Sequence, residues 1–225
     1  MNRLLLLLLA ICLFLASCAG PERYAPSSGR GPVILMLSGK TGPGLYREFA
    51  RRLAAEGYTV LLRDGNDFPV NQTELCQSKI RAIIKDNVPS SAGLPGKTVV
   101  IGYSLGGAVA LACAAAMQEE VAGVIAYYPA TSMISDHDAC VKRLKVPVMV
   151  LQGKEDRYFN CCMAEVISQI SAKAVREGRD VQLFVYPHAG HGFNLGPMKD
   201  KELDRDSWHK TLETLKKYLH DEQTF

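Results

Sequence analysis

The sequence has 225 residues, which is enough for one compact domain and short for two. Its 48% hydrophobic and 22% charged residues are ordinary for a globular protein. The formal net charge is only +3, and the Lys and Arg residues form no dense basic block, which argues against a nucleic-acid-binding protein. We therefore expect the partner to be a small molecule or a surface, and no nucleic acid.

The first residues have the pattern of an export signal. A short positive start is followed by an almost wholly apolar run, Leu4–Leu15, that is shorter than the roughly 20 residues a membrane-spanning helix needs. The run ends in Leu15-Ala16-Ser17-Cys18, which resembles the lipobox of bacterial lipoproteins, where cleavage precedes the cysteine and the new terminal Cys is acylated. The alternative is an ordinary secretory signal followed by a chance cysteine. The lipobox predicts that residues 1–17 are a signal peptide and that lipid on Cys18 anchors the exported protein to a bacterial membrane.

The next segment predicts a tether and then a single domain. Residues 20–31 are rich in Pro, Ser and Gly, so we assign 18–31 to the lipidated Cys with its tether and 32–225 to the domain.

Export permits disulfides, and a bridge from Cys140 to the adjacent Cys161-Cys162 pair is one possibility, with the connectivity left open. Cys113, in an Ala-rich helical stretch, is the candidate for a free buried thiol. No Cys or His pair has metal-ligand spacing with a second pair, so no metal is expected.

Strand and helix patterns alternate from residue 32 onward. Continuous apolar runs predict buried strands at 33–37, 58–62, 98–101, 121–127, 146–151 and 181–185. Apolar residues at helical spacing predict helices at 45–56, 73–85, 105–117, 163–176 and 206–219. This order indicates an α/β fold with a mostly parallel sheet of about six to seven strands and helices on both faces. The polar connection 129–145 is a candidate for a short cap over a site at the carboxyl ends of the strands.

The segment Gly102-Tyr103-Ser104-Leu105-Gly106-Gly107 lies between a predicted strand and a predicted helix. A strand that turns sharply into a helix holds its middle residue in a strained conformation and leaves that side chain clear of the sheet. The glycines permit the close backbone approach that such a turn requires. Ser104 is therefore the predicted nucleophile, and an idle Ser in a Gly-rich turn is the alternative.

A serine hydroxyl needs a histidine base and a carboxylate that orients it, in the chain order Ser, acid, His for this type of turn. Asp156 follows the fifth predicted strand and is the expected acid, with Glu155 as its rival. His191, flanked by glycines after the sixth strand, is the expected base, and His188 is the competitor with a structural role. Together these residues predict a Ser-His-Asp triad.

Acyl transfer also needs preorganised donors for the negative oxygen of the tetrahedral intermediate. The backbone N–H of Leu105, directly after the nucleophile, is one expected donor, and the backbone N–H of Lys40, in the loop after the first strand, is the other. The Lys40 ammonium is a further candidate for binding a substrate carboxylate, although a solvated lysine is the simpler interpretation.

Three segments carry a resemblance to a known family. Gly-Tyr-Ser-Leu-Gly-Gly at 102–107, Gly-x-x-Asp at 153–156 and Tyr-Pro-x-Ala-Gly-His-Gly-Phe at 186–193 resemble the dienelactone hydrolase family of α/β-hydrolases. The resemblance implies an α/β-hydrolase fold and hydrolysis of small esters or lactones without a cofactor. The family's namesakes have Cys at the nucleophile position, whereas this chain has Ser104, so we expect a carboxylesterase or lactone hydrolase and leave dienelactone itself unassigned.

The remaining expectations concern the substrate. Tyr103 and Tyr128 are candidate pocket residues, and the short domain predicts a small ester or lactone in a shallow cleft. We expect a monomer that meets the membrane surface only through Cys18. The alternatives are a non-catalytic binding lipoprotein with the same fold, or a small peptidase or lipase.

Overall fold

The structure is a computed structural model that describes residues 22–87 and 97–220. The predicted signal peptide and Cys18 lie outside the described residues and stay predictions. Within the described ranges, no helix has the length and apolar character needed to cross a bilayer.

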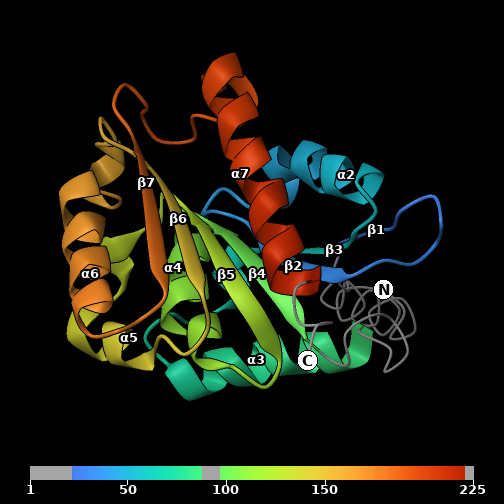
Figure 1. The fold of residues 1–225 in the computed structure, drawn as a ribbon, viewed down its shortest axis with the longest axis horizontal. Helices are drawn as coiled ribbons and strands as arrows, with labels where there is room; N and C mark the ends of the chain where they lie inside the picture. Colours follow the sequence, from blue (N-terminus) through green and yellow to red (C-terminus); the bar gives the residue numbers. More distant parts are fainter. Residues whose placement is uncertain (1–21, 88–96, 221–225) are drawn as a thin grey trace, which may run out of the picture.

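A seven-stranded sheet with the order β1-β3-β2-β4-β5-β6-β7 forms the centre of the molecule (Figure 1). Its strands are β1 (Glu22–Tyr24), β2 (Val33–Leu37), β3 (Thr59–Arg63), β4 (Thr98–Tyr103), β5 (Val121–Tyr127), β6 (Val148–Gly153) and β7 (Val181–Tyr186). From β3 to β7 all neighbouring strands run parallel, as the sequence predicted. Their carboxyl ends therefore lie at one edge of the sheet, where the loops with the predicted site residues emerge.

The edge strand β1 corrects the predicted domain boundary. Glu22–Tyr24 pairs antiparallel with β3, in the segment that the sequence analysis assigned to a tether. A side-chain ion pair between Glu22 Oε1 and Arg47 Nη2, 2.8 Å apart, ties the strand to the helix that follows β2. Three residues are too few for an alternating pattern to appear in the sequence. The folded domain begins at or before Glu22, and not at residue 32.

Six α-helices cover the two faces of the sheet in the described part of the chain. They are α2 (Arg47–Ala55), α3 (Thr73–Asn87), α4 (Leu105–Ala112), α5 (His137–Arg143), α6 (Ala164–Arg176) and α7 (Lys201–His220). Helices α2 and α7 lie on one face, and α3, α4, α5 and α6 lie on the other (Figure 1). Helix α5 was not predicted, because its seven residues are too short to show helical periodicity. It occupies part of the connection expected to form a cap, and the Asp136 side chain caps its first turn by accepting the Ala139 N–H at 2.8 Å.

The central strands are buried on both faces because helices cover both sides. Along β2, Ile34 and Met36 pack toward α2 and α7, whereas Leu35 and Leu37 join the core on the opposite face. The same alternation along β4 sends Tyr103 to the α2 and α7 face. Such two-sided burial explains why these strands read as continuous apolar runs.

The cysteines pair differently from the bridge considered above. Cys161 and Cys162 are bonded to each other, and Cys140 is free. The bridge from Cys140 to this pair, one of the possibilities left open above, is therefore not formed, and Cys140 lies on α5 with its side chain in the core, where it is 1% exposed. Cys113 is free and buried, as predicted. Burial raises the pKa of the Cys140 thiol to about 11.

Candidate active site

Ser104 occupies the sharp turn between β4 and α4. Its backbone has φ 52° and ψ −112°, a conformation that a side chain rarely adopts. The turn requires glycine at two positions. A Cβ on Gly102 would lie 2.1 Å from the Gly106 carbonyl oxygen, and a Cβ on Gly106 would lie 2.3 Å from the Leu37 carbonyl oxygen. The tight strand-to-helix turn predicted from the sequence is thus present, and Ser104 is at its apex.

Asp156 and His191 meet in the loops after β6 and β7. His191 Nδ1–H donates to Asp156 Oδ2 at 2.7 Å, with the carboxylate fully buried and the imidazole side chain 12% exposed. Asp156 Oδ1 accepts the backbone N–H of Tyr158 at 3.1 Å, so both carboxylate oxygens have a donor. This leaves Nε2 of His191 as the ring nitrogen that is available to a reacting group.

The rival pair lies outside the site. Glu155 Oε1 is 3.4 Å from His188 Nδ1, but the side chains are 62% and 91% exposed. An ion pair this exposed is solvated and contributes little to the stability of the folded protein. The geometry therefore favours Asp156 and His191 over their sequence neighbours.

Two tyrosine rings hold the His191 imidazole in place. The Tyr158 ring stacks on it with centroids 4.5 Å apart and planes 4° from parallel, while Tyr128 meets it edge-on at 4.7 Å. Tyr128 is anchored in turn, because its hydroxyl donates to Asn194 Oδ1 at 2.9 Å. The sequence analysis did not assign Tyr158, although its position two residues after the expected acid was a signal for it.

Ser104 and His191 line the same small hollow but are not hydrogen-bonded to each other in the described structure. Catalytic hydrogen bonds of unliganded sites are often long and tighten only when substrate binds. Both side chains line one small hollow, which places the serine and the imidazole beside the same bound group.

Lys40 and Leu105, the two residues predicted to supply the oxyanion donors, line the same cavity as Ser104. Among the described residues, no acceptor is found for the backbone N–H of Lys40 or for that of Leu105. The Lys40 carbonyl is fixed by the Asn66 side-chain amide at 3.0 Å. A Cβ on the preceding Gly39 would lie 3.2 Å from Ser104 Cβ, so this loop runs directly beside the predicted nucleophile.

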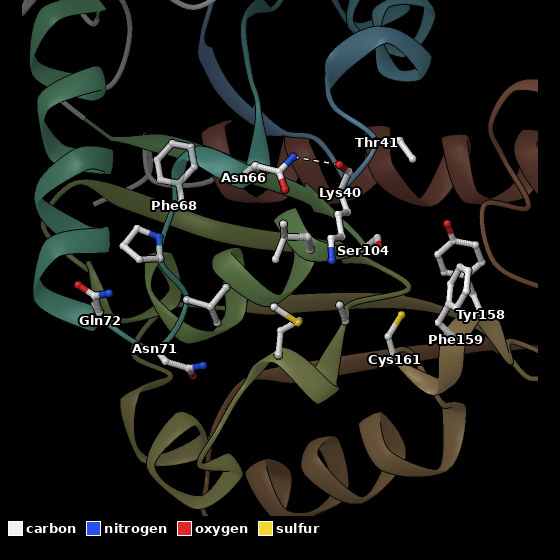
Figure 2. Close-up of a pocket in the computed structure, with 15 residues that line it drawn as sticks. Lys40, Thr41, Asn66, Phe68, Asn71, Gln72, Ser104, Tyr158, Phe159 and Cys161 are labelled. Carbon is white, nitrogen blue, oxygen red and sulfur yellow. Dashed lines mark hydrogen bonds between the residues drawn. The ribbon is translucent and has the colours of Figure 1, made fainter.

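A large pocket opens beside Ser104 and has a volume of about 750 Å³. Figure 2 shows Ser104 between one wall with Phe68, Asn71 and Gln72 and another with Tyr158, Phe159 and Cys161. The Lys40 side chain extends into the pocket from its rim and is the charged group in the lining. This volume lies in the range of ligand-binding pockets.

The second, smaller hollow has a volume of about 60 Å³ and contains His191. Tyr46 and Tyr128 also line it. Burial raises the pKa of Tyr46 to about 12 and that of Tyr128 well above its usual range, so both phenols stay neutral there. Tyr103 lines neither cavity. Its prediction as a pocket residue is wrong, because it is fully buried in the core on the α2 and α7 face, stacked on Tyr127 at 4.8 Å.

One group of potential metal ligands coincides with this site. Donor atoms of Asp156, Cys162 and His191 all lie within 4.8 Å of one another. The Cys162 sulfur is bonded to Cys161, and a metal ligand needs a free thiolate. The other two groups are hydrogen-bonded to each other, so the donor set fits an oriented imidazole better than a metal.

Comparison with protein families gives a match to the dienelactone hydrolase family over residues 19–219. The chain belongs to the dienelactone hydrolase family. Its family and its esterase neighbours make it a serine hydrolase that acts on ester bonds. Comparison with curated proteins gives no match.

Several solved structures of other proteins have the same fold as this member of the dienelactone hydrolase family. A Klebsiella pneumoniae protein provisionally described as a dienelactone hydrolase is 20% identical, with a TM-score of 0.69 and coverage of 84% of this chain and 89% of that one. Thermogutta terrifontis esterase 2 phosphorylated by paraoxon is 18% identical, with a TM-score of 0.69 and coverage of 88% and 89%. The propionate-bound form of the same esterase has a TM-score of 0.66 at 18% identity, also with coverage of 88% and 89%. These likenesses confirm the predicted α/β-hydrolase fold.

Proposed function

We propose that this chain is a carboxylesterase or lactone hydrolase with Ser104 as nucleophile, His191 as general base and acid, and Asp156 as the group that orients His191. The observation that carries the proposal is the 2.7 Å contact between the buried Asp156 carboxylate and His191, whose imidazole lines the same hollow as the serine on its strained turn. Nucleophile, base and orienting acid are the complete set that acyl transfer requires.

Acylation follows from these positions. His191 Nε2 takes the Ser104 hydroxyl proton as Oγ bonds to the ester carbonyl carbon, and the carbonyl electron pair moves onto oxygen. The backbone N–H groups of Lys40 and Leu105 stabilise that oxyanion. When the tetrahedral intermediate collapses, the bond to the alcohol oxygen breaks and His191 gives the proton to that oxygen. The alcohol leaves, and the acyl group stays on Ser104.

Deacylation uses the same groups. His191 takes a proton from a water molecule, whose oxygen bonds to the acyl carbon, and the intermediate collapses by breaking the bond to Oγ. His191 returns its proton to Ser104, and a carboxylic acid is released. Each step uses only groups of this chain, the ester and water.

A Ser104→Ala variant tests the proposal. The large pocket and the fold do not depend on one hydroxyl, so we expect ester hydrolysis to fall to background while the thermal unfolding temperature stays the same. Hydrolysis by a folded Ser104→Ala protein at the wild-type rate would rule out the assigned nucleophile.

We further propose that the chain is exported and held on a bacterial membrane by lipid on Cys18. The lipobox-like sequence supports this proposal, and the position of β1 limits its geometry. Only residues 19–21 separate Cys18 from Glu22, so at full extension the anchor lies within about 14 Å of the sheet edge. We expect Cys18→Ser to move the protein from the membrane fraction to the soluble fraction. Membrane association that survives this change without a lipid would contradict the proposal.

A further inference from the structure

Ser104 lies at the junction of two cavities that differ greatly in size. The large pocket has a volume of about 750 Å³ and the small hollow about 60 Å³. Ser104 lines both, whereas His191 lines only the small hollow. This asymmetry bears on which part of an ester each cavity receives, a question that the proposed mechanism leaves open.

The proton transfers fix the orientation of the ester. In the collapse of the tetrahedral intermediate, the alcohol oxygen must lie within hydrogen-bond reach of the imidazole that protonates it. The alcohol part is therefore on the His191 side, in the small hollow. The acyl part bonds to the same carbon and points away from His191, toward the large pocket, which Ser104 lines and His191 does not.

The sizes then set the substrate class. A cavity needs about 10–15 Å³ to hold one water molecule, so a volume of about 60 Å³ has room for only a few non-hydrogen atoms and suits a short alkyl group such as methyl or ethyl. The large pocket has apolar walls that include Phe68, Val70 and Met133, and amides at Asn71 and Gln72. These walls suit an extended apolar acyl chain.

We propose that this enzyme selects esters of a long or bulky acid with a short alcohol, with the acid in the large pocket and the alcohol in the hollow beside His191. The inference rests on the proposed function and deepens it. Each methylene moved from water into the apolar pocket raises the binding constant about fourfold. An ester with its long chain on the alcohol side does not bury that chain in the large pocket. Its chain also does not fit in the small hollow.

Two isomeric esters test the inference. Ethyl hexanoate and hexyl acetate have the same composition and similar hydrophobicity, and differ in which side of the ester carries the long chain. Hydrolysis by the purified protein is followed by titration of the released acid. We expect kcat/KM to be at least about tenfold higher for ethyl hexanoate, because four methylenes change from the small hollow to the large pocket. Equal values, or a preference for hexyl acetate, would overturn the inference.

Two methionines of similar exposure supply a matched pair of variants. Met198 lines the small hollow and is 47% exposed, whereas Met133 lines only the large pocket and is 41% exposed. We expect Met198→Ala to raise the rate on butyl hexanoate relative to ethyl hexanoate by at least threefold, and Met133→Ala to leave that ratio unchanged. An unchanged ratio in Met198→Ala, or the same rise in Met133→Ala, would contradict the assignment of the alcohol side.

Labelling with a fluorophosphonate separates the two levels of the argument. If Ser104 is labelled but ethyl hexanoate is not hydrolysed or not preferred, the partition of the substrate is wrong and the serine hydrolase stands. If a folded protein shows neither labelling nor hydrolysis, the proposed function fails and the inference fails with it.

Discussion

Replacement of Asp156 by Asn should disable His191 by reversing its proton positions, and the surrounding contacts determine how. Asp156 Oδ1 accepts the Tyr158 N–H at 3.1 Å, so the amide oxygen of Asn is drawn to that place. The NH2 group then occupies the place of Oδ2, 2.7 Å from His191 Nδ1, and the longer 3.5 Å hydrogen bond that Gln152 Nε2 donates to Oδ2 is lost. Facing a donor, Nδ1 must become an acceptor, and the proton moves to Nε2. A protonated Nε2 of a neutral imidazole cannot take the proton of Ser104.

The magnitude follows from the loss of the base. The same change in the Ser-His-Asp triad of serine proteases lowers kcat about 10⁴-fold through the wrong tautomer. Since each factor of ten corresponds to about 1.36 kcal/mol, that loss equals about 5.4 kcal/mol of barrier. We expect Asp156→Asn to lower kcat by about 10³- to 10⁴-fold, with little change in KM, because the substitution touches neither cavity wall.

The assay measures kcat and KM for ethyl hexanoate, with circular dichroism to show that the variant is folded. Glu155→Gln is the matched control, because it makes the same chemical change at the adjacent residue, whose side chain is 62% exposed. It should keep kcat within about twofold, as expected for loss of an exposed ion pair. A folded Asp156→Asn enzyme with more than a tenth of wild-type kcat, or a Glu155→Gln enzyme with a large loss, would refute the reasoning.

Three further predictions concern the support of the site. Tyr158→Ala should lower kcat roughly threefold to tenfold, because it removes the ring stacked on His191. Tyr158→Phe keeps the ring and should stay near wild type. Equal losses of kcat in the two variants would count against the stacking role. The proposed oxyanion donor at Lys40 is the backbone N–H, so Lys40→Ala should change kcat less than about threefold. Lys40→Pro removes that N–H and should lower kcat about a hundredfold or more. A large loss of kcat in Lys40→Ala would place the role in the side chain instead. Gly106→Ala should lower the thermal unfolding temperature by several degrees, because overpacking costs roughly 1–3 kcal/mol of stability. Gly44→Ala is the control, since no atom lies within 4 Å of the added Cβ, and should leave the temperature unchanged. Equal unfolding temperatures in the two variants would contradict the close packing at the turn.

The parallel part of the sheet could be predicted closely because its strands are buried on both faces. Every predicted strand is present with its ends shifted by at most two residues, since a continuous apolar run has clear limits. The edge strand β1 and the short helix α5 were missed because three and seven residues, respectively, are too few to show a period.

Site residues could be predicted where glycines and chain order constrain them. Ser104, Asp156 and His191 each follow a strand at the same edge of the sheet, and the structure brings the last two into contact. Tyr103 was misplaced, because the sequence does not reveal which face of the sheet a strand residue takes. Alternation places it with Val99 and Ile101 on the α2 and α7 face, away from both cavities.

Cavity size and cysteine pairing depend on packing between distant segments, so the sequence could not supply them. The wall of the large pocket combines the turn around Phe68 with the loop around Cys161, which are far apart in the chain. The bond between Cys161 and Cys162 leaves Cys140 without a partner sulfur in the described structure, a result that no spacing rule predicts.

Covalent labelling of the purified protein with a fluorophosphonate, mapped by mass spectrometry, tests the central claim most directly. The probe requires an activated serine and oxyanion donors but no knowledge of the substrate, and paraoxon phosphorylates Thermogutta terrifontis esterase 2, which has the same fold. We predict one adduct, on Ser104, that is lost in His191→Ala and kept in His188→Ala. A folded protein that is not labelled, or is labelled at another residue, would contradict the account and favour a binding protein with a hydrolase fold.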